Sequence, residues 1–486
     1  MKLNIIKYRY KGVFSVVLFS TLMFTSCNNF LDEQPPSGTI IEENSFENFA
    51  DVQSALYGAY RFTTYNWFVI ALNAWAGDNA QRSRDNGGIG TIYFNWTYNS
   101  SNAVEVEAIY LRAYNLVLAV NKILDNIDLV EGGTEDEKNE VKAQCYALRA
   151  MAHFDLSRLY AAKYTATGDG GHLGIPYLTE STNASSLPSQ NTVKEVYNLA
   201  IQDLTTAYDL FTDYAVSNPT FISKVAVDAL LQRLYLYKED WAKVIEIGNR
   251  IIDDSGLMLA TGSDYINMYT PSENPGEFIF KVGLPAGVNF SIPLISGTSN
   301  MGDIFAFGTS VNNYIPNAEF AASFDANDIR PDILFTVMNG SPTLDKDFVN
   351  KYSGTGFSGT TDQPYARLSE VYLSMAEAYF ELNQPAEARA KLDAVRAARI
   401  SAYVSIGENG TALRDAIRTE RRKELAYEGH RFWDLSRWGL GVNRGTTCVD
   451  LATGNCTLAA DDFRFVMPIP QHEMNANPNM VQNTGF

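Results

Sequence analysis

Apolar side chains recur at steps of three and four residues along most of this chain, and no other feature limits its fold as much. In the first such run, Phe46, Phe49, Val52, Leu56 and Tyr60 fall on one face of a helix. Comparable runs occupy residues 104–130, 137–163, 192–211, 223–237, 241–253, 367–381, 385–399 and 413–438. Residues 260–365 are instead rich in Gly, Ser, Pro and aromatic residues, with short strand-like segments such as 277–282. We therefore predict a mainly α fold of packed helices with long loop and short-strand insertions, not alternating βαβ units.

Two helix pairs in this pattern resemble the tetratricopeptide repeat, in which small residues let paired helices approach and Tyr and Leu fill the gap. The stronger match is carried by Tyr372, Met375, Ala376, Tyr379, Ala388, Leu392 and Val395. The weaker match is carried by Leu231, Tyr235, Val244 and Ile251. Such repeats predict a scaffold with a binding face rather than a catalytic site.

The N-terminus has the features of an export signal. Residues 1–11 carry four basic side chains and no acidic one, and residues 13–24 are mostly apolar (VFSVVLFSTLMF). This run is too short to cross a bilayer as a helix, which takes about 20 residues. Cys27 follows two small residues and precedes the polar Asn28, as the acylated cysteine of a bacterial lipoprotein does. We predict that residues 1–26 are a lipoprotein signal peptide and that Cys27 carries the lipid; ordinary secretion with an unmodified cysteine is the alternative.

The charge balance excludes one large class of partner. The 486 residues include 38 basic and 56 acidic side chains, so the formal net charge is −18. Proteins that bind nucleic acid need basic clusters against phosphate, and we therefore expect no nucleic-acid partner. A hydrophobic content of 46% is enough for a sizeable core and excludes a wholly disordered chain.

The remaining cysteines predict one disulfide. Cys448 and Cys456 lie in a loop-like stretch with Gly454 and Asn455 as a turn signal, and an exported protein meets an oxidising compartment. We predict that these two cysteines are bonded. Cys145 lies on an apolar helical face and is expected to be a buried thiol. None of the spacings resembles a zinc or redox motif.

Sequence patterns of known catalytic sites are missing. The four histidines are His153, His172, His430 and His472, and no two have the spacing of a metalloprotease helix. The chain also lacks a G-x-S-x-G elbow and a P-loop, and the glycine-rich stretch at 354–356 is interpreted as a flexible turn. We predict no catalysis, no metal and no cofactor. Glycosidase carboxylates have no fixed spacing in sequence, so a secreted hydrolase stays open as an alternative.

Residues 419–439 (TERRKELAYEGHRFWDLSRWG) are dense in charges of both signs. Mixed charge along a helix is typical of a salt-bridged face, and we predict ion pairs within the helix here. The side chains concerned are Glu420, Arg421, Arg422, Lys423, Glu424 and Glu428, followed by Trp433 and Trp438 as packing residues and by Arg431, Asp434 and Arg437 as local partners.

Several stretches of the chain resemble the SusD/RagB family of outer-membrane nutrient-binding lipoproteins from Bacteroidetes. They are the mature start 27–35 (CNNFLDEQP), the helix and loop 147–160 and 174–178, the helical core 365–399 and 419–439, and the tail 465–486 with its Pro-Ile-Pro and Asn-Pro motifs. The resemblance implies a SusD-like helical fold with tetratricopeptide-like pairs and a binding protein rather than an enzyme. A region 27–255 and a region 256–486 would pack as one compact unit.

The same resemblance implies a location and partners. The protein would be lipid-anchored in the outer membrane, facing the cell exterior, and would act as a hinged lid over a SusC-like TonB-dependent transporter. Its ligand would be a glycan, with oligopeptides or another nutrient as the alternative. An assembly adaptor with no small ligand is an alternative of another class.

Aromatic rings in loops are the candidate ligand contacts, because sugars pack their C–H faces on rings and bond their hydroxyls to polar groups. Two regions qualify, 65–102 and 289–314. We predict ligand contacts from Trp67, Asp78, Arg82, Tyr93, Trp96, Asn99, Phe290 and Phe305. For each Trp a place in the core is the alternative, most of all for Trp75 in a helix-like run, and Asp78 could instead anchor a loop.

Overall fold

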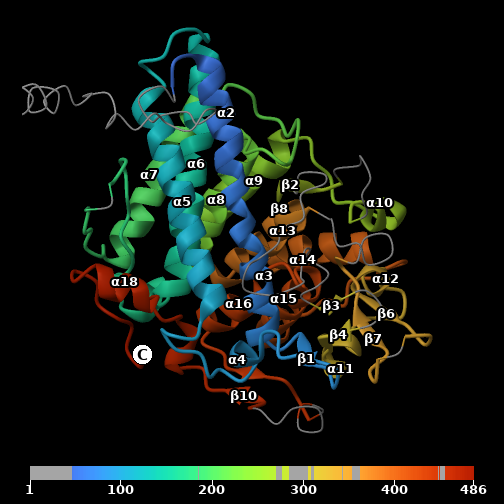
Figure 1. The fold of residues 1–486 in the computed structure, drawn as a ribbon. Helices are drawn as coiled ribbons and strands as arrows, with labels where there is room; N and C mark the ends of the chain where they lie inside the picture. Colours follow the sequence, from blue (N-terminus) through green and yellow to red (C-terminus); the bar gives the residue numbers. More distant parts are fainter. Residues whose placement is uncertain are drawn as a thin grey trace, which may run out of the picture. The chain divides into compact units, whose positions relative to one another are not determined.

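Long helices from the first half of the chain lie side by side in the computed structural model (Figure 1). They are α2 (Phe49–Tyr60), α5 (Val104–Asn126), α6 (Glu135–Tyr160), α7 (Val193–Leu210), α8 (Lys224–Lys238) and α9 (Trp241–Asp254). Each helix in this order packs against the next one. Capping boxes fix the starts of α6 at Thr134 and of α7 at Thr192, because each Thr and a Glu three residues later bond one another's backbone.

The structure describes residues 46–183, 185–269, 276–283, 305–307, 311–341, 343–352, 362–446, 448 and 455–486. The predicted signal peptide and Cys27 therefore lie outside the described residues. Asn48–Phe486 fall into one compact unit. In the part of the chain that is described, no helix is long and apolar enough to cross a membrane.

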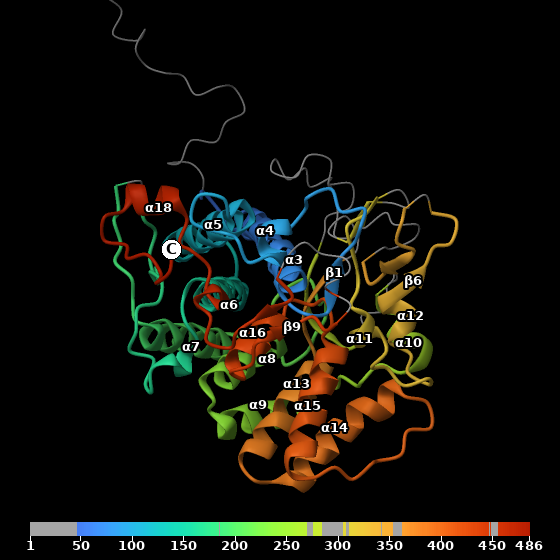
Figure 2. The same ribbon diagram turned by 90° about the horizontal axis from the view of Figure 1, so that it is seen from below.

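The second half adds α13 (Leu368–Glu381), α14 (Pro385–Arg399), α15 (Gly410–Glu424) and α16 (Arg431–Arg437). Figure 2 shows α13, α14 and α15 beside α9. Helix α13 packs against α14, α15, α8 and α9, so the two predicted repeat pairs, α8–α9 and α13–α14, share one core. At their contact a Cβ on Gly248 would lie 2.4 Å from the Met375 Sδ. Only glycine lets α9 approach α13 this closely.

Short antiparallel strand pairs and short helices fill the rest. The pairs are β1 (Ala80–Arg82) with β5 (Tyr314–Pro316), β2 (Phe278–Val282) with β8 (Gln363–Arg367), β3 (Ala306–Phe307) with β4 (Val311–Asn312), β6 (Phe335–Val337) with β7 (Asp347–Val349), and β9 (Val442–Asn443) with β10 (Thr457–Leu458). The short helices are η3 (Arg61–Tyr65), α3 (Asn66–Ala76), α4 (Thr91–Phe94), η4 (Tyr164–Ala166), α10 (Gly262–Asn267), α11 (Ala318–Ala321), α12 (Pro331–Leu334), η6 (Phe463–Phe465) and α18 (Gln471–Ala476). This bears out the predicted mainly α fold with short-strand insertions.

The charged segment 419–439 differs from its prediction in two ways. It is not one helix: Tyr427 (φ 61°) and Gly429 (φ 81°) turn the chain between α15 and α16. Asp434 and Arg437 pair within α16 as predicted, but the ion pairs of Glu420, Arg421, Glu424 and Glu428 are buried and join different elements. Glu424 meets the guanidinium groups of Arg330, Arg367 and Arg399, all fully buried. Packing α15 into the interior forces this, because a buried charge needs a partner.

Burial of the Glu424 carboxyl favours its neutral form, yet its pKa lies well below the ordinary value because Arg399, Arg367 and Arg330 surround it. Burial likewise opposes ionisation of Glu428, but Arg367 and Lys351 hold its pKa below the ordinary value. We call this set of paired residues the Glu424 cluster; it consists of Glu277, Asp328, Arg330, Lys351, Arg367, Arg396, Arg399, Glu420, Glu424 and Glu428.

Candidate functional site

Trp96, predicted as an exposed platform, is buried against an arginine. The Arg444 guanidinium lies 4.1 Å from the centroid of the Trp96 ring and 3.7 Å from that of Phe94. It also donates to the carbonyls of Trp75 (2.9 Å) and Gly77 (3.0 Å) at the end of α3. Trp96 is only 2% exposed. The prediction for Trp96 is therefore wrong, because its ring already stacks on a cation of the protein.

Tyr93 and Trp75 form the adjoining part of this core. Their rings stack with centroids 5.7 Å apart, and Trp75 stacks on Tyr314 at 6.1 Å. Gly90 (φ +64°) lies so close to the Trp75 ring that a Cβ on Gly90 would be 2.4 Å from a ring carbon. The Tyr93 hydroxyl donates to Glu105 (2.9 Å). The alternative of a core place for Trp75 is confirmed, whereas the prediction that Tyr93 contacts ligand is wrong because the ring is fully buried.

Two more predicted aromatic contacts are buried. Trp67 belongs to α3, all of whose residues are buried, and its ring meets Phe68 edge-on. Phe305 is 1% exposed and packs on Tyr427. These two predictions are wrong for the same reason, since a buried ring has no free face. Phe290 lies outside the described residues.

Asp78 anchors the end of α3 to the C-terminal helices. Both of its carboxylate oxygens accept from Arg431, at 2.7 and 2.8 Å, and Arg422 lies 3.4 Å away. Although burial opposes ionisation, these cations lower the pKa of Asp78 to about 2. The carboxylate is therefore occupied, and the alternative of a loop anchor replaces the predicted ligand contact.

Arg82 and Asn99 are the predicted contacts that reach the surface among the described candidates. Arg82 is half-buried at the end of β1, and its Nε has no hydrogen-bond partner among the described residues. Asn99 is exposed, but its Oδ1 accepts from the amides of Ser101 (2.9 Å) and Asn102 (3.2 Å) and so closes a turn. The structure does not join the predicted residues into one open site.

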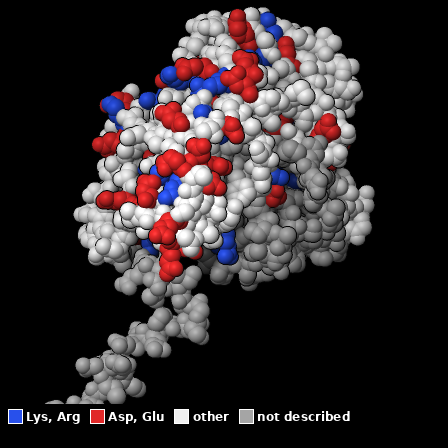
Figure 3. Space-filling view, turned by 90° about the horizontal axis from the view of Figure 1, so that it is seen from above, with Lys and Arg blue, Asp and Glu red and all other residues white. Residues whose placement is uncertain are grey.

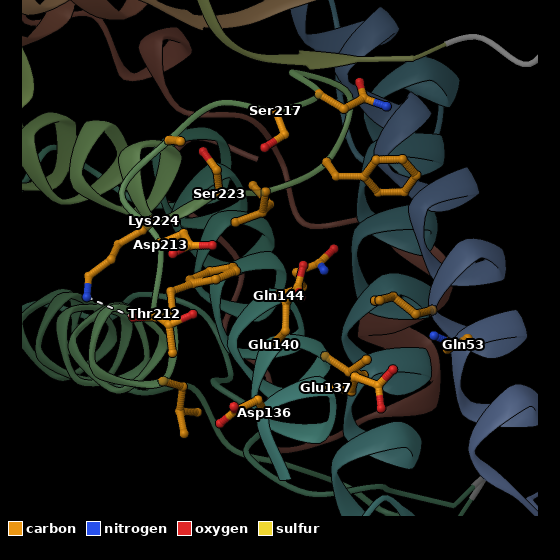
Figure 4. Close-up of a pocket in the computed structure, with 18 of the residues that line it drawn as sticks. Gln53, Asp136, Glu137, Glu140, Gln144, Thr212, Asp213, Ser217, Ser223 and Lys224 are labelled. Carbon is orange, nitrogen blue, oxygen red and sulfur yellow. Dashed lines mark hydrogen bonds between the residues drawn. The ribbon is translucent and has the colours of Figure 1, made fainter. Parts of the chain in front are cut away.

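An open cavity lies elsewhere, between α2, α6 and the connection from α7 to α8. Its volume is about 500 Å³ (Figure 4). The figure shows Gln53 of α2 facing the segment that holds Thr212, Asp213, Ser217 and Ser223, with Gln144 of α6 between them. We call this space the first cavity.

A second cavity of about 400 Å³ adjoins the first. Tyr57 and Phe221 line both, and their rings meet edge-on with centroids 5.7 Å apart. Tyr57 is 58% exposed, so its ring face is available between the two spaces. The second cavity also contains Arg61 and Asp362. The two cavities together are called the α2 groove.

A hydrogen-bond chain orients Gln144 beside the first cavity. The Tyr60 hydroxyl accepts from the amide of Ile222 (2.9 Å) and therefore donates to Gln144, at 2.6 Å from its Oε1. This assigns the Gln144 amide oxygen to Tyr60 and leaves the NH₂ group turned away from it. Burial raises the pKa of Tyr60, so its hydroxyl keeps the proton that it donates to Gln144.

The rim of the first cavity is acidic. Asp136, Glu140 and Asp213 line it, and none of them has a hydrogen bond or ion pair with a described residue. The one basic lining residue, Lys224, has its Nζ 2.8 Å from the Phe211 carbonyl and over the Tyr208 ring. Acidic side chains also gather over the face of the molecule drawn in Figure 3.

Comparison with known proteins covers both halves of the chain. Residues 29–236 match a family model described as starch-binding associating with outer membrane, and residues 338–486 match the model of the SusD family. The chain belongs to the SusD family.

Relatives within the SusD family extend this match to nearly the full length. SusD-like protein P2 of Formosa agariphila is 26% identical over 98% of this chain and 99% of its own. A SusD superfamily protein of Bacteroides thetaiotaomicron superposes with a TM-score of 0.77 at 25% identity, covering 90% of this chain and 99% of that one. A putative sugar binding protein of Bacteroides vulgatus has a TM-score of 0.77 at 26% identity, covering 91% and 99%.

Other chemistry of this SusD-family chain is structural. His153 is buried, its pKa lowered to about 3 by desolvation, and it bonds the backbone at Arg149 and Leu178. Cys448 and Cys456 form a disulfide with an S–S distance of 2.07 Å, whereas Cys145 is a buried free thiol. Across the described ranges, no three metal-ligating side chains gather into a group.

The α2 groove was missed from the sequence. Its parts come from segments far apart in the chain, each unremarkable alone. One signal was available, because Tyr57 breaks the polar face of the first predicted helix with an aromatic ring. By contrast, the run 66–76 (NWFVIALNAWA) is apolar around most of a helix, which indicates a buried helix rather than a binding loop.

Proposed function

We propose that this protein binds oligosaccharide at the cell surface and delivers it to a SusC-like TonB-dependent transporter, without turning it over. The observation that carries the proposal is the match of both halves of the chain to SusD-family models, one of them named for starch binding and outer-membrane association. The solved Bacteroides vulgatus protein, named as sugar binding, supports the same class of ligand. Lipid on Cys27 would hold the chain in the outer membrane, with the folded part outside the cell.

Within the predicted site, we propose that Arg82 contacts the ligand. Arg82 is half-buried at the end of β1, so part of its side chain reaches solvent, and a guanidinium group offers several N–H donors to sugar hydroxyls. Asn99 would contribute its amide nitrogen beside the turn that it closes. Oligopeptides or another nutrient remain the competing ligand class.

The test is a screen of purified full-length protein against neutral and acidic polysaccharides by affinity gel electrophoresis. We expect retardation by at least one polysaccharide, reduced by Arg82→Ala. Arg414→Ala is the matched control, because Arg414 is also half-buried and, among the described residues, pairs with its neighbour Asp415. Binding of peptides but of no polysaccharide would replace the ligand class, and release of reducing ends would show a hydrolase.

The anchor and the transporter need a second experiment in the native host. Radiolabelled palmitate should be incorporated into the wild-type chain and not into a Cys27→Ser variant. Purification of the tagged wild-type protein from outer membranes should also recover a TonB-dependent transporter. A wild-type chain that is released unlabelled and alone would contradict both parts.

A further inference from the structure

We infer that the first cavity of the α2 groove is itself a saccharide site and that it takes uncharged sugar units while rejecting acidic ones. This inference rests on the proposed function, because it assumes a carbohydrate ligand. The inference adds the location of the binding site and the charge class of the sugar, and the family match supplies neither.

The first argument is the donor that Gln144 presents. The side chain is 8% exposed and lines the cavity, and its amide oxygen is bound to Tyr60. Its NH₂ group has no partner among the described residues. The Tyr60 hydroxyl accepts from Ile222 and donates to the Gln144 oxygen, which turns the NH₂ group away from Tyr60. A ligand therefore has to offer Gln144 an acceptor, such as a sugar hydroxyl.

The second argument is the set of acceptors on the rim. Asp136, Glu140 and Asp213 are exposed carboxylates without partners among the described residues. Ionised carboxylates only accept hydrogen bonds, so they require donors from the ligand. A sugar hydroxyl both donates and accepts, and neighbouring hydroxyls of one ring can satisfy Gln144 and the rim together.

The third argument is the ring face of Tyr57. It stands 58% exposed where the two cavities meet, held edge-on against Phe221. Phe221 in turn packs edge-on against Tyr60, with centroids 5.0 Å apart, so the same residue that orients Gln144 also supports the aromatic wall. A pyranose presents an apolar C–H face and an edge of hydroxyls, which suit the aromatic ring and the polar groups beside it.

Charge decides between sugar classes. A uronate or sulfate in the first cavity would meet the carboxylates of Asp136, Glu137, Glu140 and Asp213, and the Lys224 ammonium is already engaged by Phe211 and Tyr208. One unit of like charge at 4 Å in water weakens binding by roughly fivefold, and several such charges within a Debye length act together. Arg61 lines only the second cavity, so the exclusion applies to the first.

The experiment compares neutral and acidic tetrasaccharides on the full-length protein. The neutral set contains glucose tetramers linked α-1,4, β-1,3 and β-1,4, and the acidic set contains tetramers of glucuronate and galacturonate. Titration calorimetry gives each Kd, and hydrogen exchange by mass spectrometry locates the site. We expect at least one neutral tetramer to bind at least tenfold more tightly than any acidic one, with slower exchange in residues 211–224 and at the start of α6.

Variants separate charge from folding. Glu140→Gln keeps an acceptor oxygen but removes the charge, so the affinity for an acidic tetramer relative to a neutral one should rise about threefold to fivefold, by the charge estimate above. Tyr57→Ala should weaken neutral binding tenfold or more, by loss of a stacking face. Glu387→Gln on α14 is the control, as another exposed carboxylate without a partner among the described residues, and should change neither.

The outcomes distinguish the two proposals. Tighter binding of an acidic tetramer, or neutral binding that leaves exchange at 211–224 unchanged, overturns this inference and leaves carbohydrate binding intact. Absence of binding by all tetramers also overturns it if the polysaccharide screen is positive. A negative polysaccharide screen removes the proposed function itself.

Discussion

The Glu424 cluster and the rim of the first cavity both contain glutamate carboxylates, but these carboxylates have opposite surroundings. Inside the molecule, Glu424 meets three guanidinium groups and is fully buried. On the rim, Glu140 is exposed and meets no described cation. A buried charge without a partner is too costly to persist, whereas an exposed one is stabilised by water and can exchange that water for a ligand. Pairing, not residue type, therefore separates structural carboxylates from those available for binding.

Aromatic residues show the same contrast. Trp96 stacks on Arg444 and is 2% exposed, whereas Tyr57 leaves 58% of its surface open. A search guided by tryptophan residues would therefore have selected the buried Trp96 and missed the exposed ring of Tyr57. The following predictions test this contrast, beginning with the largest expected effect.

Removing the charge of Glu424 should have the largest effect. Glu424→Gln leaves three buried guanidinium groups short of a counter-charge, and breaking a buried pair costs about 3–5 kcal/mol. Urea denaturation followed by circular dichroism should show a large fall in the midpoint, whereas Glu387→Gln should stay within about 0.5 kcal/mol. Equal midpoints for both variants would show that the cluster contributes little.

Removing Arg444 should have the next largest effect. Arg444→Met leaves buried carbonyls at the end of α3 without donors, and each unsatisfied group costs about 1–3 kcal/mol. Arg444→Lys should recover little of the loss, because an ammonium cannot bond several carbonyls and cover two rings at once. Thermal unfolding of both variants measures this, and full recovery by lysine would contradict the described geometry.

Asp78 should give a pH dependence of intermediate size. Its folded pKa of about 2 is below the ordinary value of 3.8, so its stabilisation is complete above pH 4 and is lost as the pH falls toward 2. The shift corresponds to roughly 2 kcal/mol. Free energies of unfolding of wild type and Asp78→Asn should therefore converge across this range. Curves that stay parallel would contradict the shift.

Neutralising the rim should have the smallest effect on stability. Glu140→Gln removes an exposed carboxylate without a described partner, so the free energy of unfolding should change by less than about 0.5 kcal/mol. The same urea titration measures it. A loss above 1 kcal/mol would mean that Glu140 supports the fold and would make its binding data unusable.

The helices could be predicted from sequence because their signals are local. Thr134 with Glu137 and Thr192 with Glu195 mark two starts within four residues of chain. The turn at Tyr427 was missed because a left-handed tyrosine has no local signal. The fate of Trp96 was missed because its partner region is remote: Arg444 bonds Phe94 across 350 residues of sequence. The α2 groove was missed likewise, since only the fold brings Tyr57 and Phe221 together.

The close contact at Gly248 has a mechanical consequence. Helix α9 ends at Asp254 and α13 begins at Leu368, so these helices belong to the two regions divided at residue 255 in the sequence-based prediction. With no room for even one methyl group between Gly248 and Met375, α9 and α13 cannot slide past each other without disrupting the core that they share. In the proposed delivery to a transporter, α9 and α13 should therefore move together as one rigid body.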